Sequence, residues 1–278
     1  SLNDSLPICS TVAAAGAMLL MTISCAAYAQ TGASPKLYNT AKQKLLDGKQ
    51  IIGGTVMSTD PNVYCAMANA GFDFLWIEMQ HSPLSYGEVA RMIYACKGAP
   101  ATPFIRVPDA TEGDIQKAMD IGALGIIVPM VDTPEKAAAA VKWAKYPPIG
   151  QRSQGAGQYR ELYGSSYRQT ANDNLVMVIM IETPTGAANA DKIAAVPGVD
   201  VVFVASGDLG SFSTYKQGDP KYEALVTTIH DATLKAGKKL GGPMNWTSRP
   251  DYKFFQAMDE AAFIQAGAQA ALKGVPGR

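Results

Sequence analysis

Short uninterrupted apolar runs alternate along the chain with longer segments whose apolar residues recur every three or four positions. Such short runs are typical of strands buried on both faces of a parallel sheet, and the longer periodicity is typical of helices that cover it. The pattern predicts eight strands, at residues 51–57, 74–78, 103–107, 125–130, 175–182, 201–205, 239–243 and 262–265. Helices are predicted between them, for example over 111–123, 133–145 and 221–237.

This alternation of strands and helices predicts an α/β protein with a parallel sheet. Eight such units in about 250 residues favour one closed (β/α)8 TIM barrel, here expected over residues 30–278, and an open doubly wound sheet is the alternative. No Gly-x-Gly-x-x-Gly motif follows a predicted strand. The sequence therefore gives no support for dinucleotide binding.

The first thirty residues differ from the rest of the chain. Residues 12–23 read VAAAGAMLLMTI without a charge, and Ala27-Tyr28-Ala29 supplies a small-x-small exit. This pattern is typical of a secretory signal peptide, and the run is too short for a membrane span, which needs about 20 residues. We expect residues 1–29 to be a signal peptide, leaving a periplasmic or secreted protein without a stable membrane span. The alternative is a buried N-terminal helix in a cytoplasmic protein.

Two cysteines, Cys65 and Cys96, remain in the mature chain that this processing predicts. They could form a disulfide in an oxidising compartment. The sequence contains no Cys-x-x-Cys pair and no zinc-type Cys/His spacing. Of the two interpretations we favour a pair of buried thiols on helices.

Composition excludes two broad classes. The chain is 47% apolar and 17% charged, and its 24 basic and 24 acidic residues give a net charge of zero. A disordered chain would be less apolar and more strongly charged. No basic excess is available to neutralise phosphates, so nucleic acid is not an expected partner.

Charged side chains occur where four of the predicted strands end. Glu78 and then His81 follow one strand, and Arg106, Glu182 and Asp208 follow three others. A charge at the end of a buried strand is costly unless it is paired, bound to a metal or exposed. The carboxyl ends of barrel strands meet at the mouth, where barrel enzymes have their active sites. We therefore expect these side chains to converge there.

The residue types at this end suit chemistry next to a carbonyl group. Glu182 and Asp208 could bind one divalent cation together with water. Arg106 offers a planar fork for a carboxylate or a developing enolate, and His81 is the candidate base at neutral pH. Such a set suits proton abstraction or carbon–carbon cleavage. For Glu78 the alternative is a structural ion pair with Arg106.

Residues 70–211 resemble the HpcH/HpaI aldolase family, the class II metal-dependent 2-oxoacid aldolases. The resemblance is carried by GFDFLWIEMQHSP, FIRVPD, IQKAMDIGALGIIVPMVDTPEKAAAAVKWAKYPPIGQRS and MIETPTGAANADKIAAVPGVDVVFVASGDL. It implies a (β/α)8 barrel, a divalent Mg, Mn or Co ion and a pyruvate-like donor. It also implies a homo-oligomer, whether a dimer, a trimer or a hexamer.

The same resemblance implies roles for individual residues. It implies metal ligands at Glu182 and Asp208, an enolate-stabilising arginine at Arg106 and the base at His81. Asp120 matches an aspartate that reaches the active site across or near a subunit contact, and a charge at a helix end is the alternative for it. Gly207 and Asp208 match a segment whose backbone N–H groups hold the pyruvate carboxylate.

The chain also departs from the family pattern. The family typically has Asp-x-Glu-His where this chain has Glu78-Met79-Gln80-His81, so one carboxylate is longer and one negative charge is lost. We keep Glu78 in the catalytic set and place Gln80 among the substrate-binding residues. Trp246, after the seventh predicted strand, is a further candidate for substrate contact.

Three tyrosines, Tyr159, Tyr163 and Tyr167, recur every four residues in the least regular part of the chain, residues 146–174. This spacing predicts one face of a single helix. We favour core or interface packing over an aromatic wall for the substrate.

The sequence thus predicts an exported, metal-dependent lyase that cleaves a 4-hydroxy-2-oxoacid to pyruvate and an aldehyde. Its partners are small 2-oxoacids or aldehydes. A related lyase or decarboxylase acting on a divergent substrate, including an aromatic one, is one alternative. A citrate-lyase-like CoA ester lyase is disfavoured by export. A non-catalytic periplasmic ligand-binding protein on the same barrel is the third.

Overall fold

The computed structural model describes residues 37–275 of the chain. The predicted signal peptide, residues 1–29, lies outside the described part, so its prediction stays open. Residues 35–278 group into one compact unit. Within 37–275, no helix is both long enough and apolar enough to cross a lipid bilayer.

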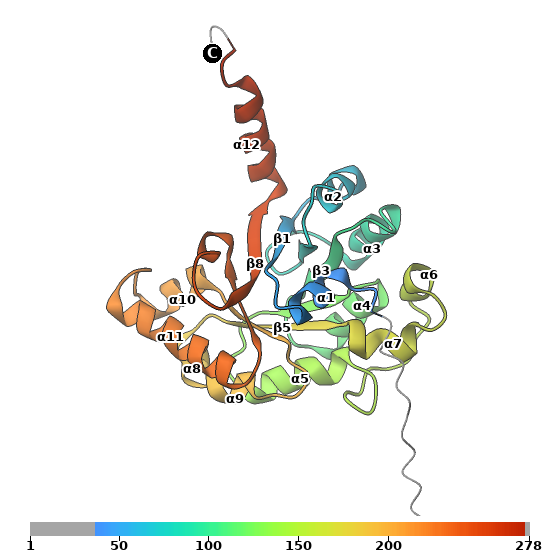
Figure 1. The fold of residues 1–278 in the computed structure, drawn as a ribbon. Coiled ribbons are helices and arrows are strands. Elements are labelled where there is room, and N and C mark those ends of the chain that lie inside the picture. The colour runs from blue at the N-terminus through green and yellow to red at the C-terminus, as the bar shows by residue number, and fades with distance from the viewer. Residues whose placement is uncertain (1–36, 276–278) are drawn as a thin grey trace, which may run out of the picture. The chain divides into compact units, whose positions relative to one another are not determined.

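Eight parallel strands close into a barrel in which each strand pairs with the next and the last pairs with the first (Figure 1). They are β1 (Ile51–Val56), β2 (Phe74–Glu78), β3 (Thr102–Arg106), β4 (Gly125–Val128), β5 (Val176–Ile181), β6 (Val201–Val204), β7 (Lys239–Pro243) and β8 (Tyr252–Asp259). The predicted TIM barrel is therefore confirmed, and the open doubly wound alternative is excluded.

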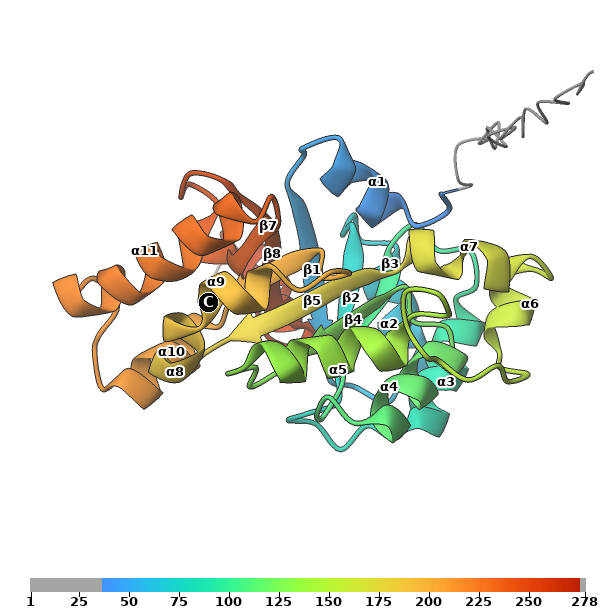
Figure 2. The same cartoon turned by 90° about the horizontal axis from the view of Figure 1, so that it is seen from below.

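Helices cover the outside of the strands (Figure 2). They are α1 (Thr40–Leu46), α2 (Pro61–Ala68), α3 (Tyr86–Ala95), α4 (Glu112–Asp120), α5 (Pro134–Ala144), α6 (Tyr159–Tyr163), α7 (Tyr167–Asn174), α8 (Pro184–Ala188), α9 (Ala190–Ala194), α10 (Ser206–Ser213), α11 (Pro220–Lys235), α12 (Glu260–Leu272) and the 3-10 helix η1 (Met244–Trp246). Several begin at a side-chain cap that the sequence supplies. Ser85 and Glu88 form a capping box before α3, and Thr111 caps α4.

Alternate residues of each strand point into the barrel, because successive side chains of a strand face opposite sides. The inward set includes Phe74, Trp76, Phe104, Phe203 and Phe254, which form one buried cluster. The rings of Phe74 and Phe254 stack at 4.5 Å between centroids, and those of Phe74 and Phe104 lie 4.7 Å apart. These aromatic side chains fill the barrel interior below the mouth.

Two glycines make room for this packing. A Cβ atom at Gly53 would lie 2.1 Å from the Phe74 ring, and one at Gly125 would lie 2.2 Å from the Phe104 ring. Only a residue without a side chain fits opposite a ring at such distances. The outward residues of the strands form a second and larger cluster with the helices, which includes Ile77, Ile105 and Ile179.

The eighth strand differs from its prediction. Residues 262–265 were expected to form it, but they lie in α12, whose first turn is capped by the Asp259 side chain. The strand is instead Tyr252–Asp259. Its buried pattern is interrupted by half-buried Lys253 and Gln256, and residues 244–251, which begin with the short η1 helix, separate it from β7. Residues 261–264, which read AAFI, form an uninterrupted apolar run although they lie in a largely exposed helix. They therefore matched the pattern expected of a buried strand better than the interrupted sequence of β8 did.

The tyrosine-rich segment is also different from its prediction. It forms two short helices, α6 and α7, because Gly164 ends α6 with a positive φ of 91°. The expected stack still forms: Tyr159 and Tyr167 lie 4.3 Å apart, and Tyr163 stacks on Tyr38 at 5.1 Å. The cluster lies on the connection that leads into the start of β5, at the end of the barrel opposite the mouth. This position agrees with packing and not with a substrate wall.

The two cysteines form a disulfide between α2 and the end of α3. The Cys65 and Cys96 Cα atoms are 5.4 Å apart, within the range of a normal bridge. The expectation of two separate thiols is therefore wrong. Spacing along the sequence could not show that the two helix ends would meet.

Candidate active site

Polar residues replace apolar ones at the last inward positions of three strands. Glu78 follows Trp76 by two positions, Arg106 follows Phe104 and Glu182 follows Met180, so the inward row of each strand continues into a charged group. All three side chains are nearly fully buried. The structure thus brings together at the mouth three of the side chains that the strand ends predicted.

The Glu78 carboxylate is completely engaged in hydrogen bonds. One oxygen accepts from Trp76 Nε1 and from Arg106 Nη1, both at 3.1 Å. The other accepts from the backbone N–H groups of Gln80 at 2.8 Å and His81 at 3.0 Å. The predicted alternative, a Glu78–Arg106 ion pair, is confirmed. Glu78 therefore acts here through its neighbours, because it fixes both the arginine and the turn that carries His81.

Arg106 is held on one side only. Its Nη1 atom binds Glu78, whereas its buried Nε and Nη2 atoms have no hydrogen-bond partner among the described residues. A buried donor without a partner costs about 1–3 kcal/mol, so its persistence points to a ligand that accepts from it. The guanidinium therefore has two nitrogen donors, Nε and Nη2, available for an anionic oxygen.

Glu182 is a buried acid with an altered titration. Burial, together with a smaller contribution from the Asp208 carboxyl, raises the pKa of Glu182 to about 7 against the opposing effects of the Met130 N–H group and the Arg106 charge. Asp208 itself is exposed, in the first turn of α10. Two carboxyl groups in contact repel each other when both are ionised, and a cation between them removes that repulsion.

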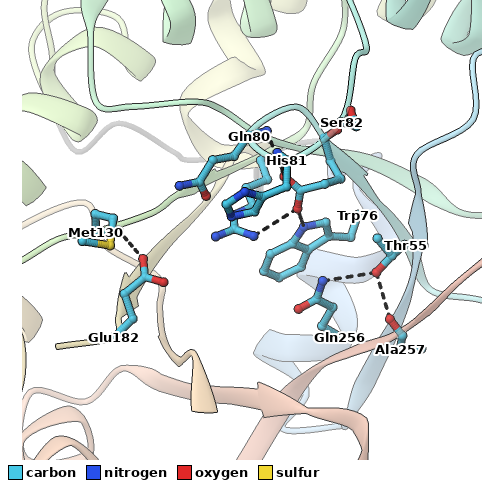
Figure 3. A network of polar contacts seen from close by, with 11 residues as sticks. Thr55, Trp76, Gln80, His81, Ser82, Met130, Glu182, Gln256 and Ala257 are labelled. Atoms are coloured by element: carbon cyan, nitrogen blue, oxygen red, sulfur yellow. Dashed lines mark hydrogen bonds and ion pairs between the residues drawn. The ribbon is translucent and has the colours of Figure 1, made fainter. Parts of the chain in front are cut away.

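The Met130 backbone was not foreseen as part of the site. Its N–H group donates to the Glu182 carboxylate, as Figure 3 shows, and Met130 has a φ of 54°, in the left-handed region. A residue other than glycine in that region is strained, and such strain is common at functional sites. No side-chain pattern could have revealed a backbone donor at this position.

His81 and Gln80 lie on the turn after β2, above the Glu78 carboxylate. His81 is exposed, and its ring makes no hydrogen bond within residues 37–275. Gln80 is half-buried, and its buried Oε1 atom has no partner in the same part of the chain. Figure 3 shows both side chains above Trp76. Both are free to meet a ligand, and their predicted roles as base and substrate-binding residue stay predictions.

Comparison with known proteins identifies the family of this chain. The model of the HpcH/HpaI aldolase/citrate lyase family matches residues 55–277. The chain belongs to this family. It is 35% identical over 195 residues to a 2-dehydro-3,6-dideoxy-6-sulfogluconate aldolase of Pseudomonas putida, covering 69% of this chain and 76% of that one.

Two further matches extend the comparison. The chain is 35% identical over 211 residues to a hydroxypyruvate/pyruvate aldolase of Pseudomonas aeruginosa, with 73% of this chain and 78% of that one covered. The crystal structure of an HpcH/HpaI aldolase/citrate lyase family protein from Burkholderia cenocepacia superposes with a TM-score of 0.78 at 27% identity, covering 85% of this chain and 99% of that one. The chain is thus an aldolase of the lyase class.

Two residues predicted from the family pattern, Asp120 and Gly207, are not brought to Arg106 and Glu182 by a contact within the described chain. Asp120 ends α4, at the end of the barrel opposite the mouth, where it binds Arg152 Nη2 at 2.7 Å. Within one chain it does not meet Arg106 or Glu182, so its role across a subunit contact stays a prediction. Gly207 lies beside Asp208 in the first turn of α10, directly after β6.

Trp246 is buried in the outer cluster between strands and helices, and not in the mouth. Its ring packs edge-on against Tyr252 at 5.5 Å, and the Arg249 guanidinium lies 4.0 Å from it. The structure therefore gives Trp246 a packing role, and it does not bring this residue to the other predicted substrate contacts.

Proposed function

We propose that the protein cleaves a 4-hydroxy-2-oxoacid to pyruvate and an aldehyde. The observation that carries the proposal is Arg106, whose buried Nε and Nη2 groups have no partner within residues 37–275 and lie near the buried Glu182. Hydrogen-bond donors fixed in advance at the place where negative charge develops are a large source of rate enhancement. Membership of an aldolase family supports the same reaction.

We further propose that Glu182 and Asp208 hold a divalent cation, Mg, Mn or Co. The fit is supported by a donor set made only of oxygens and by the contact between two carboxyl groups in a largely buried site. In the described part of the chain no group of three or more His, Cys, Asp or Glu side chains is placed to hold a metal ion, so water and substrate would complete the coordination. When bound, the cation acts as a Lewis acid on the 2-oxo group.

The side chains of this protein supply the remaining steps. In the cleavage direction His81, exposed above the mouth, takes the proton of the 4-hydroxyl group. The C3–C4 bond then breaks, the aldehyde forms at C4, and the electron pair of that bond passes into the enolate of pyruvate. Arg106 donates to the enolate oxygen while Glu78 keeps the guanidinium in place. Return of the proton to C3 gives pyruvate.

A direct test measures pyruvate release from a panel of 4-hydroxy-2-oxoacids and from oxaloacetate. Each substrate is assayed with added Mg, Mn or Co and again with a chelator. Pyruvate that requires the cation and disappears with the chelator supports the proposal. If oxaloacetate alone reacts, the protein is a decarboxylase, and if a cation binds but no substrate turns over, it is a ligand-binding protein.

We also propose that the protein is exported to the periplasm or secreted. The Cys65–Cys96 disulfide supports this, because disulfides persist in oxidising compartments and are rare in the cytosol. Expression of the full chain, fractionation and N-terminal sequencing test it. The expected result is a periplasmic or secreted protein that begins near Gln30 and has no free thiol at either cysteine, whereas an intact N-terminus in the cytosol contradicts it.

A homo-oligomer is the third part of the proposal. Helix α12 leaves the barrel after β8, and most of its residues are exposed, including the apolar Ile264 and Leu272 (Figure 1). A helix with exposed apolar residues favours a covering partner. Light scattering of the purified protein should give a dimer, trimer or hexamer, and a replacement of Ile264 by Lys should weaken the assembly.

A further inference from the structure

Two polar residues in the barrel mouth have no role in the reaction described so far. Gln256 of β8 follows the inward Phe254 by two positions, and Thr55 of β1 follows the inward Ile51 by four. Both therefore belong to the inward rows that end in Glu78, Arg106 and Glu182 on other strands. Because the eighth strand was predicted at residues 262–265, the sequence pattern did not identify Gln256 as a residue at a strand end.

Hydrogen bonds fix the direction of the Gln256 amide. The Thr55 hydroxyl donates to the Ala257 carbonyl at 2.8 Å, so its oxygen can only accept from the glutamine. Gln256 Nε2 lies 3.2 Å from that oxygen and is the donor. The amide nitrogen must therefore face Thr55, and Figure 3 shows the amide oxygen turned away from it.

This amide oxygen is an acceptor in an otherwise apolar part of the mouth. Thr55 is paired with Trp76 in the register of β1 and β2, and Figure 3 shows the indole next to the Thr55–Gln256 pair. The inward neighbours deeper in the barrel are Phe203 and Phe254. Gln256 is half-buried, so its oxygen can be reached by a ligand. A ligand hydroxyl next to the Trp76 indole can therefore donate to this oxygen.

The pair also lies across the barrel from Glu182. In a closed barrel of eight strands, β1 is opposite β5, and Glu182 directly follows β5. Figure 3 shows Glu182 on one side of the view and Thr55 with Gln256 on the other. A substrate whose 2-oxoacid end is held at Glu182 and Arg106 therefore extends its other end toward Gln256.

We propose that Gln256 is a specificity-determining residue whose amide oxygen accepts a hydrogen bond from a hydroxyl group on the aldehyde-derived part of the substrate. Thr55 is its positioning residue. The inference rests on the proposed aldolase reaction and names the class of aldehyde, an uncharged hydroxyaldehyde. A carboxylate at the same place is disfavoured, because the amide oxygen offers it no donor.

The test compares two aldehydes that differ by one hydroxyl group, lactaldehyde and propionaldehyde, each added to pyruvate in the synthetic direction. The readout is the ratio of their kcat/KM values within one protein. The wild-type protein should favour lactaldehyde. Gln256→Leu keeps the side-chain size and should lower this ratio by roughly 10- to 100-fold, the loss expected for one unmade hydrogen bond in a partly buried site.

A matched control makes the same chemical change at the other end of β1. Gln50 precedes that strand and donates to the Thr247 and Tyr252 carbonyls, away from the mouth. Gln50→Leu should leave the aldehyde ratio at the wild-type value. An equal fall in both Leu variants would show that a general loss of packing, and not the acceptor at Gln256, changes the ratio.

Thr55 gives a second route that keeps the inference testable if Gln256→Leu does not fold. Thr55→Val removes the hydroxyl that holds the amide and should lower the ratio by about 3- to 10-fold, whereas Thr55→Ser should restore it. If Thr55 were only structural, Thr55→Val would lower kcat/KM for both aldehydes by the same factor. The ratio of the two kcat/KM values would then stay at the wild-type value in both Thr55→Val and Thr55→Ser.

The outcomes separate this inference from the proposed function. If the wild-type protein forms a product from pyruvate and both aldehydes without preferring lactaldehyde, or if the ratio survives Gln256→Leu, the role of Gln256 is refuted and the aldolase reaction stands. If no aldehyde reacts and no hydroxy-oxoacid releases pyruvate, both proposals fail together.

Discussion

The two ends of the barrel each contain a buried arginine paired with a carboxylate, and the two pairs are built differently. At the mouth, Arg106 binds Glu78 at 3.1 Å and keeps Nε and Nη2 unpaired. At the opposite end, Arg152 binds Asp120 at 2.7 Å and the Tyr167 hydroxyl at 2.9 Å. One arginine keeps donors for a ligand, and the other uses most of its donors within the chain.

The aromatic rings near the two arginines also differ. The Arg152 guanidinium lies over three tyrosine rings, at 4.6 Å from Tyr146, 5.2 Å from Tyr159 and 5.5 Å from Tyr167. Cation–π contacts of this kind stabilise a desolvated guanidinium without leaving it reactive. Arg106 has only the more distant Trp76 ring, at 6.0 Å. Among the described residues Arg152 leaves only Nε without a partner, whereas Arg106 leaves both Nε and Nη2, so the two arginines differ in how many donors remain for a ligand.

The comparison predicts its largest effect at Arg106. Arg106→Lys keeps the charge but loses the planar fork, so kcat/KM for pyruvate release should fall by roughly 10²- to 10³-fold, the usual cost of a lost donor to a developing oxyanion. Steady-state kinetics measures the fall, and circular dichroism checks that the variant is folded. Near wild-type activity would show that the unpaired donors do not serve the reaction.

The opposite effect is expected for Arg152. Arg152→Leu removes the charged donor to Asp120, which keeps only the Gln116 amide, and the donor to the Tyr167 hydroxyl, and it should lower the free energy of unfolding by about 3 kcal/mol. Urea denaturation measures this loss. The kcat/KM of the folded protein should change by less than about twofold, because Arg152 lies far from the mouth. A fall like that of Arg106→Lys would instead mean that the Asp120 pair serves a neighbouring subunit's site.

The smallest effect concerns Glu182 in protein kept free of metal by a chelator. The pKa of Glu182 is raised to about 7 in the folded state, so between pH 4.5 and 7 the unfolded chain releases a proton that the folded chain retains. Stability should therefore fall as pH rises through this window, by about 2–3 kcal/mol, and stay low above it.

Urea denaturation at pH 5 and pH 8 tests this expectation. Glu182→Gln has no proton to lose at this position, so the fall should be reduced in that variant. Added Mg or Mn should raise the free energy of unfolding of the wild-type protein more at pH 8 than at pH 5, because the cation competes with the proton for the carboxylates. Parallel pH profiles for the two proteins would contradict the raised pKa.

The strand pattern predicted most of the barrel and much of its mouth. The runs that became β2 and β7 were placed with their observed bounds, because they are bounded by polar residues and turn signals. Glu78, Arg106 and Glu182 were found for the same reason, since a charge after a buried run can only lie at a strand end. These inferences needed only the alternation of residues along the chain.

The remainder depends on contacts that the alternation does not encode. The strand β8 was missed because Gln256 interrupts its apolar run, so the Thr55–Gln256 pair was missed with it. The Met130 N–H group contributes through its backbone, which any residue type could supply. The Cys65–Cys96 bridge requires the relative placement of two helices. Each of these features is set by tertiary packing.

The aromatic packing inside the barrel has one more consequence. Phe74, Phe104 and Phe254 fill the interior below the mouth, so a ligand cannot enter the barrel from the opposite end. Both products must then leave by the route through which the substrate enters.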